Sequence, residues 1–128
     1  IMGESVLTRE DVLQGHRFND AICAASYPID LHHPVGGDCT LEWCDDCYDI
    51  PYRCLLPKGI EGLLLAGRCI STTHEAMAST RVMSICMATG EAAGKAAQIA
   101  VKENKMPREI DIHTLQESLR QEGVYFRD

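Results

Sequence analysis

The feature that most constrains the fold is a long helical pattern near the carboxyl end of the chain, RVMSICMATGEAAGKAAQIAVKENK, residues 81–105. At about 3.6 residues per turn, the polar side chains predicted to face solvent fall on one narrow stripe, formed by Glu91, Lys95, Gln98 and Lys102. The opposite face is a row of small side chains, formed by Cys86, Gly90, Ala93, Gly94, Ala97 and Val101. Glycine inside a helix costs about 1 kcal/mol relative to alanine. The row of small residues therefore predicts that another backbone or a ligand lies tightly against the helix. Ordinary packing of the helix on a sheet would also explain the row.

A second pattern, LLLAGRCIS, covers residues 63–71 and comes before this helix. Its apolar run predicts a buried strand that ends at Gly67. An arginine, a cysteine and a hydroxyl side chain follow within four residues, so polar groups gather where the strand is expected to end.

Capping signals predict two more helices. Thr8 and Asp11 have the spacing of a capping box, so we expect a short helix that stops near Gly15. A last helix is expected between the N-cap Asp111 and the terminator Gly123, with its apolar residues on one face.

Strand signals lie between these helices. Residues 21–33, AICAASYPIDLHH, predict a strand that is kinked at Pro28. Residues 48–62 predict a further strand closed by a Pro-Lys-Gly turn. Residues 34–49 show no periodicity and are expected to form a long loop. The combination of strands and separate helices indicates an α+β fold.

Composition narrows the classes of function. The chain has 128 residues, the length of one ordinary domain, and a net charge of −7. It has no dense cluster of lysine and arginine, which argues against binding to nucleic acid or to an anionic membrane surface. No apolar run is long enough to span a membrane, and the opening residues IMGESVLTRE lack the pattern of a signal peptide, so we expect a soluble protein. The first residue is Ile rather than Met, which fits a processed product, a trimmed chain or a piece of a longer protein.

The cysteines suggest a possible metal site. Their odd number, seven, disfavours a scaffold of internal disulfides, which agrees with a reducing cytoplasm. Cys39, Cys44 and Cys47 lie close together in the stretch CTLEWCDDC, just after His32 and His33. Three thiolates and one histidine could hold a structural zinc ion, and the C-x-x-C pair could also form a redox disulfide. The neighbouring acidic residues disfavour thiolates, so free thiols in a loop are the simplest interpretation.

Five short motifs occur in order and at close spacing between Ile50 and Ala97: IPYR.LLP, AGR.IS, HEA, R.M and G.AAG.AA. In these motifs the chain resembles the carboxyl-terminal portion of bacterial FAD-dependent oxidoreductases, which are related in architecture to the fumarate reductase flavoprotein and glutathione reductase superfamily. Residues 1–33, through LT.EDV and YPID.H, resemble the part of the substrate domain just upstream in the same family.

The resemblance implies a fold and a division of the chain. The chain would be the C-terminal fragment of a two-domain, Rossmann-like FAD-binding flavoprotein. Residues 1–57 would belong to a β-rich substrate domain and include the Cys-rich loop at 34–49. Residues 58–128 would supply the last strand and the last helices of the FAD-binding domain.

The resemblance also implies residues beside the cofactor. The last strand of the nucleotide-binding sheet would end at Gly67, where the flavin approaches the main chain more closely than a Cβ allows. The next helix would begin near Arg81 and direct its first N–H groups toward the flavin ring. The implied cofactor-binding positions are Gly67, Arg68, Ser71, Val82, Met83, Gly90 and Ala93.

Four residues would face the reacting groups in such a flavoprotein. His74 and Arg81 would lie beside the flavin ring, where histidine can shuttle a proton and arginine can hold an anionic substrate or the reduced flavin. Arg53 and His32 would reach the same cleft from the substrate side, or serve as structural or solvated groups.

The glycine-rich turn G-x-G-x-x-G, which binds the FAD pyrophosphate in this family, is absent from the sequence. We therefore expect the chain to be the carboxyl third of a larger enzyme, and to bind FAD weakly or not at all and be inactive by itself. Its partners would be the remainder of the parent flavoprotein and a small-molecule substrate. The alternatives are a small structural zinc-binding module, or a helical interaction module that self-associates through its Gly/Ala face.

Overall fold

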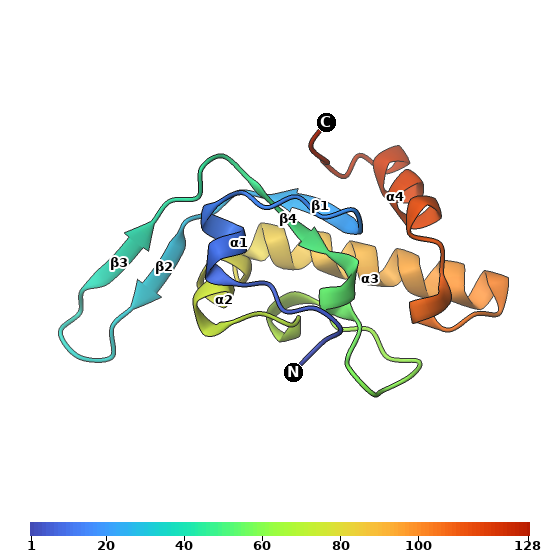
Figure 1. Cartoon of the computed structure of the whole chain (residues 1–128), viewed down its shortest axis with the longest axis horizontal. Helices are drawn as coiled ribbons and strands as arrows, with labels where there is room; N and C mark the ends of the chain where they lie inside the picture. The colour runs from blue at the N-terminus through green and yellow to red at the C-terminus, as the bar shows by residue number, and fades with distance from the viewer.

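In the computed structural model, which describes residues 1–128, helix α3 (Met83–Glu103) is the longest element, and the two strands β1 (Ala21–Ala25) and β4 (Tyr48–Pro51) run alongside it (Figure 1). The other helices are α1 (Arg9–Leu13), α2 (His74–Thr80) and α4 (Ile112–Gln121). Three short 3-10 helices are η1 (Tyr52–Leu55), η2 (Gly67–Cys69) and η3 (Pro107–Glu109). The other strands are β2 (Ile29–His32) and β3 (Cys39–Glu42). Helices combined with small antiparallel sheets confirm the α+β class.

The predicted helix caps are confirmed. The Thr8 hydroxyl accepts a hydrogen bond from Asp11 N at 3.2 Å, and the Asp11 carboxylate accepts one from Thr8 N at 2.9 Å. Asp111 caps α4 by accepting a hydrogen bond from Thr114 N at 2.9 Å, and α4 ends just before Gly123. These local bonds satisfy N–H groups that have no partner within the helix.

The strands form two separate antiparallel pairs, β1 with β4 and β2 with β3. The chain leaves β1 before Pro28, so the predicted kinked strand is two strands that belong to different sheets. The β2–β3 pair projects from one end of the molecule as an arm (Figure 1).

The prediction of a long loop over residues 34–49 is wrong, because this segment contains β3 and the start of β4. The side chains of β3 are mostly exposed and those of β4 are all buried. Neither strand therefore alternates between apolar and polar residues, which is the pattern that reveals a strand in a sequence.

The strand predicted to end at Gly67 is also absent from this chain. Residues 63–66 are not paired in a sheet, and the segment is fixed by one backbone hydrogen bond, from Leu65 N to Leu55 O at 2.8 Å. Ala66 has extended dihedral angles, φ −150° and ψ 161°, before η2 begins. A strand requires a neighbouring strand to accept and donate its backbone hydrogen bonds, and none is supplied here.

Helix α3 begins at Met83, two residues later than predicted. Arg81 is instead the C-cap of α2, and Val82 is an extended N-cap with φ −71° and ψ 152°. No glycine or proline marks this break in the sequence, so the helical pattern alone could not locate it.

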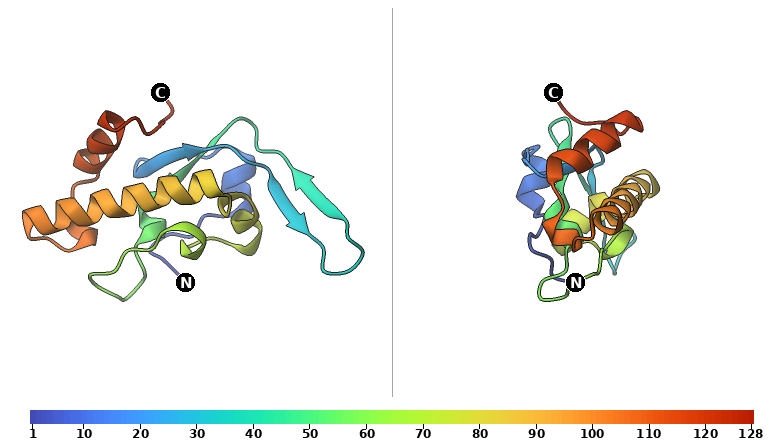
Figure 2. Two further views of the ribbon diagram at one scale, coloured as in Figure 1. Left: turned by 180° about the vertical axis from the view of Figure 1, so that it is seen from behind. Right: turned by 90° about the vertical axis from the view of Figure 1, so that its right-hand side faces the viewer.

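The small-residue row of α3 faces a different way from the prediction. The buried face consists of Ile85, Thr89, Ala92, Ala93, Ala96, Ile99 and Ala100. Ala93 is the one member of the predicted row that is buried, whereas Gly90, Gly94, Ala97 and Val101 are exposed. No atom lies within 4 Å of the position that a Cβ would take on Gly90 or Gly94. Seen from behind, α3 lies in front of the other elements (Figure 2, left). The tight neighbour that the row predicts is therefore not another part of residues 1–128.

One apolar core joins both predicted parts of the chain. It contains Leu7, Tyr48 and Leu55 from the first part, and Ala92 and Leu115 from the second. The boundary after residue 57 stays a prediction. No helix is both long enough and apolar enough to cross a lipid bilayer.

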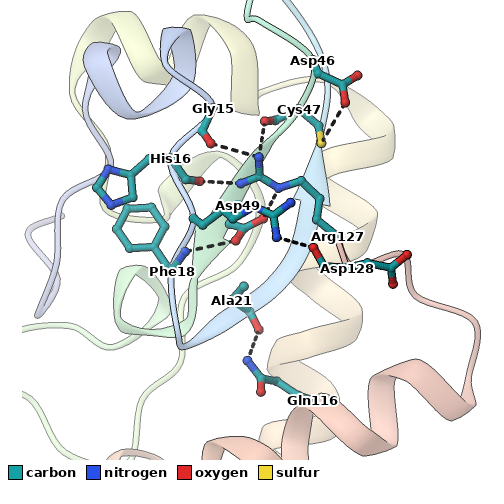
Figure 3. Close-up of polar contacts among 11 residues, drawn as sticks. Gly15, His16, Phe18, Ala21, Asp46, Cys47, Asp49, Gln116, Arg127 and Asp128 are labelled. Carbon is teal, nitrogen blue, oxygen red and sulfur yellow. Dashed lines mark hydrogen bonds and ion pairs between the residues drawn. The ribbon is translucent and has the colours of Figure 1, made fainter.

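The last six residues, 123–128, form a C-terminal strap that returns to β1, where Ala24 N donates a hydrogen bond to Tyr125 O at 3.0 Å. The Arg127 side chain fixes this strap. It binds the Asp49 carboxylate at 2.9 Å and donates to the carbonyl oxygens of Gly15, His16 and Cys47 at 2.7–2.9 Å (Figure 3). Burial acts to lower the pKa of Arg127, but the hydrogen bond and the charge of Asp49 outweigh it and the pKa is raised.

Candidate functional site

Two of the predicted groups meet where η2 packs against the amino-terminal turns of α3. Gly67 N donates a hydrogen bond to the Thr89 hydroxyl at 2.9 Å, and this hydroxyl donates to Cys86 O at 2.9 Å. A Cβ added to Gly67 would lie 3.8 Å from Cys86 Cβ and Sγ. Gly67 also has φ +64°, a left-handed conformation that glycine adopts without strain. The predicted closeness of Gly67 to the start of this helix is confirmed.

The first turn of α3 is open to a ligand. The N-cap Val82 has no side-chain group that accepts a hydrogen bond from the first N–H groups, and no acidic residue stands in the first turn. Met83 is 83% exposed. An uncapped helix start of this kind presents free N–H groups and a partial positive charge, which suit a negatively charged group.

The remaining residues predicted to bind the cofactor differ in exposure and in hydrogen bonding. Arg68 is exposed, and its guanidinium forms no ion pair or hydrogen bond within the chain. Ser71 is 1% exposed and its hydroxyl accepts a hydrogen bond from Gly3 N at 2.8 Å, so in this chain it holds the amino-terminal segment. Gly90 lies on the open face of α3, whereas Ala93 lies in the core.

A pocket of about 210 Å³ brings three of the four predicted catalytic residues together. His32 comes from β2, and His74 and Arg81 come from the two ends of α2. Asp30, which the sequence predictions missed, lies between them. Its Oδ2 is 3.3 Å from His32 Nε2 and 3.5 Å from Arg81 Nη2.

A sequence signal could have identified Asp30. Asp30 and His32 are two residues apart in a strand, so their side chains project from the same face. The Asp30 side chain is 16% exposed, and its Oδ1 is buried without a hydrogen-bond partner. The carboxylate orients Arg81 and His32 and partly balances the arginine charge. The pocket therefore presents two imidazoles able to transfer a proton, and an arginine able to bind an anionic group.

Arg53 does not line the Asp30 pocket, so of the two roles expected for it the structural one agrees with this structure. Arg53 forms a bidentate ion pair with Asp20, with Nε–Oδ2 at 2.8 Å and Nη2–Oδ1 at 3.0 Å. The hydrogen bonds to Asp20 raise the pKa of Arg53. Both residues line a different surface depression, beside His113.

The structure does not support the predicted zinc site, because no group of three or more potential ligands is found. Cys39 is exposed on β3, whereas Cys44 and Cys47 are buried in the connection from β3 to β4. Burial and the neighbouring Asp46 and Asp49 raise the pKa of Cys47, although Arg127 acts in the opposite direction. All seven cysteines are free thiols.

The model of the family "FAD dependent oxidoreductase" matches residues 1–119, which include both regions described above. The chain belongs to this family of FAD-dependent oxidoreductases. No curated protein and no solved structure matches the chain. Membership in this oxidoreductase family supports flavin-linked redox chemistry and FAD as the cofactor of the parent enzyme.

The residues at the start of α3 fit an FAD molecule in three respects. The helix start is uncapped, Arg68 is a cation without a partner, and the main chain at Gly67 carries no side chain. These features are suited to a ligand that is anionic along its phosphates and reaches close to the backbone. The Ser71 hydroxyl does not contribute to the fit, because it is buried and already bonded.

Proposed function

We propose that this chain forms one wall of an FAD site in a larger flavoprotein that oxidises or reduces a small molecule by two electrons. The observation that supports this proposal best is the bond from Gly67 to Thr89, which holds the η2 backbone beside the uncapped start of α3. Arg68, Val82, Met83 and the Gly67 main chain would contact the cofactor. Gly90 would contact it or the sheet beside it. FAD, when bound, supplies the hydride acceptor or donor.

The pocket around Asp30 would be the substrate side of this site. Arg81 would hold an anionic group of the substrate, and Asp30 would keep the guanidinium in place. His74 is exposed at the first position of α2, so its ring is free to accept or release a proton of the substrate. His32 would assist from β2, through its contact with Asp30.

The remainder of the parent protein would cover surfaces that are open here. The segment at 63–66 is unpaired and ends at Ala66, whose backbone is extended, which suits a strand that would pair with a strand of the parent protein. The exposed face of α3 carries Met83, Met87 and Val101, which are 83%, 74% and 83% exposed. We propose that the preceding part of the parent supplies both the neighbouring strand and the pyrophosphate-binding turn, in a reducing cytoplasm where the thiols stay free. Without that part, the isolated chain would self-associate through the α3 face.

The first test is the flavin content of the natural protein. The polypeptide that contains this sequence would be isolated from its source, its length measured by mass spectrometry and its visible absorption recorded. We expect a chain longer than 128 residues that carries FAD, and a recombinant chain of residues 1–128 that carries little or none. A natural protein without flavin would refute the proposal.

A pair of glycine substitutions localises the site. Gly67→Ala should reduce the FAD content of the parent, because it strains η2 beside α3. Gly59→Ala is the matched control, since Gly59 also has a positive φ, +74°, but lies in a loop with no atom near its Cβ position. Equal FAD content in the two variants would show that the cofactor does not depend on the Gly67 junction.

A further inference from the structure

A pocket beside the C-terminal strap is lined by three arginines, Arg17, Arg120 and Arg127. Its volume is about 230 Å³, and it lies between the segment before β1, helix α4 and the strap. The strap and Arg120 lie beyond residue 119, where the match to the oxidoreductase family ends. The pocket has no residue in common with the Asp30 pocket or with the Gly67 junction.

The one acidic residue in the pocket, Asp49, is already neutralised. Its Oδ1 accepts from Arg127 Nε at 2.9 Å, and its Oδ2 accepts from Phe18 N at 3.0 Å (Figure 3). Three further N–H groups of Arg127 donate to backbone carbonyl oxygens. Arg127 and Asp49 therefore form an ion pair that lines the pocket and contributes no net charge to it.

Arg120 leaves the pocket with a positive charge that no acidic group of the chain balances, and Arg17 has further N–H groups that can reach a ligand. Neither of them forms an ion pair with an acidic side chain, although the chain as a whole has a net charge of −7. Arg120 is held by stacking, with its guanidinium carbon 4.5 Å from the centre of the Phe126 ring, and its N–H groups have no acceptor in the chain. Arg17 donates one hydrogen bond, to the main-chain oxygen of Asp128, which in the chain of residues 1–128 is a carboxylate oxygen, and its other N–H groups have no acceptor in the chain.

A guanidinium is planar and offers pairs of parallel N–H donors, which match the oxygens of a phosphate or a carboxylate. Phe18 and Phe126 also line the pocket and can contact an apolar part of a ligand. We propose that this pocket binds a small oxyanion, a phosphate or carboxylate group of a metabolite, through Arg17 and Arg120. The site is separate from the flavin site and does not depend on the function proposed above.

The experiment is a titration of the ¹⁵N-labelled chain with inorganic phosphate and, separately, with acetate, at constant ionic strength. We expect saturable shifts of the amide signals of Phe18, Arg120 and Phe126. Saturation by phosphate alone would assign the pocket to phosphate-bearing ligands, and saturation by acetate would extend it to carboxylates. Shifts that rise linearly without saturation, or that spread evenly over the surface, would overturn the proposal.

Matched substitutions connect binding to the two arginines. Arg17→Ala and Arg120→Ala should each weaken binding roughly tenfold or more, since hydrogen bonds to charged groups are lost. Lys58→Ala removes the same charge from an exposed loop residue without an ion pair, and should leave the affinity within about twofold of the original. If Arg120→Ala disturbs the spectrum of the free protein, Arg120→Gln keeps most of the side chain that stacks on Phe126. Equal affinities in the double arginine variant and the Lys58 variant would refute the site.

Discussion

Replacing Arg127 by alanine should be the most destabilising single change outside the apolar core. The side chains of Arg127 and Asp49 are 12% and 9% exposed, and the substitution leaves the Asp49 carboxylate buried with one backbone donor. Removing one member of a buried ion pair costs about 3–5 kcal/mol. Because both groups retain some exposure, water can partly hydrate the released carboxylate and carbonyl oxygens. We therefore expect a loss of about 3 kcal/mol in the free energy of unfolding.

Two further variants separate charge from hydrogen bonding. Arg127→Lys keeps the positive charge but cannot reach all four acceptors, so a loss of about half that size, roughly 1.5 kcal/mol, is expected. In the double variant Arg127→Ala with Asp49→Asn, no charge remains buried, and the loss should be smaller than the sum of the single losses.

The assay is urea unfolding followed by circular dichroism, with the midpoint and slope measured for each variant. Arg68→Ala is the matched control, because Arg68 is exposed and has no partner, and its change should stay within about 0.5 kcal/mol. If Arg127→Ala costs no more than Arg68→Ala, the strap contributes nothing to stability and the reasoning from the buried pair fails.

Three other predictions follow from buried side chains. Thr89→Val should lower the free energy of unfolding by about 1–2 kcal/mol, because Gly67 N loses its acceptor. Thr80→Val should leave it unchanged or raise it, because the buried Thr80 hydroxyl has no partner. Equal losses of the two variants in urea unfolding would contradict this difference. Iodoacetamide added to the folded protein at pH 8 should label the exposed Cys39 and Cys69 first and leave the buried Cys23 and Cys54 unlabelled. Peptide mass spectrometry would identify the labelled residues, and early labelling of Cys23 would disprove its burial. Burial raises the pKa of Cys23 and of Cys54 from 9.0 to about 12. Between pH 9 and pH 12 the unfolded chain therefore binds fewer protons than the folded chain, and the free energy of unfolding should fall as the pH rises. Urea midpoints that stay constant across this range would argue against the shifts.

The sequence contained enough local information to predict α1, α3 and α4 and the caps of α1 and α4, but it did not predict α2. The Thr8 capping box and the Asp111 cap depend on residues three positions apart, and such short-range bonds do not need the rest of the fold. The motifs around Gly67 and α3 likewise identified the family that the matching model confirms. The family resemblance placed His74 and Arg81 in one cleft, and both residues line the same pocket.

Tertiary structure decided the features that depend on residues far apart in the chain. The sequence does not reveal that Arg127 binds Asp49, that Arg53 binds Asp20 rather than reaching the cleft, or that β3 pairs with β2. The sequence also does not determine which side of α3 is buried, because small residues on both sides of the helix are compatible with close packing. These outcomes depend on the path of the whole chain, because an ion pair or a ladder of hydrogen bonds forms only when folding brings both partners together.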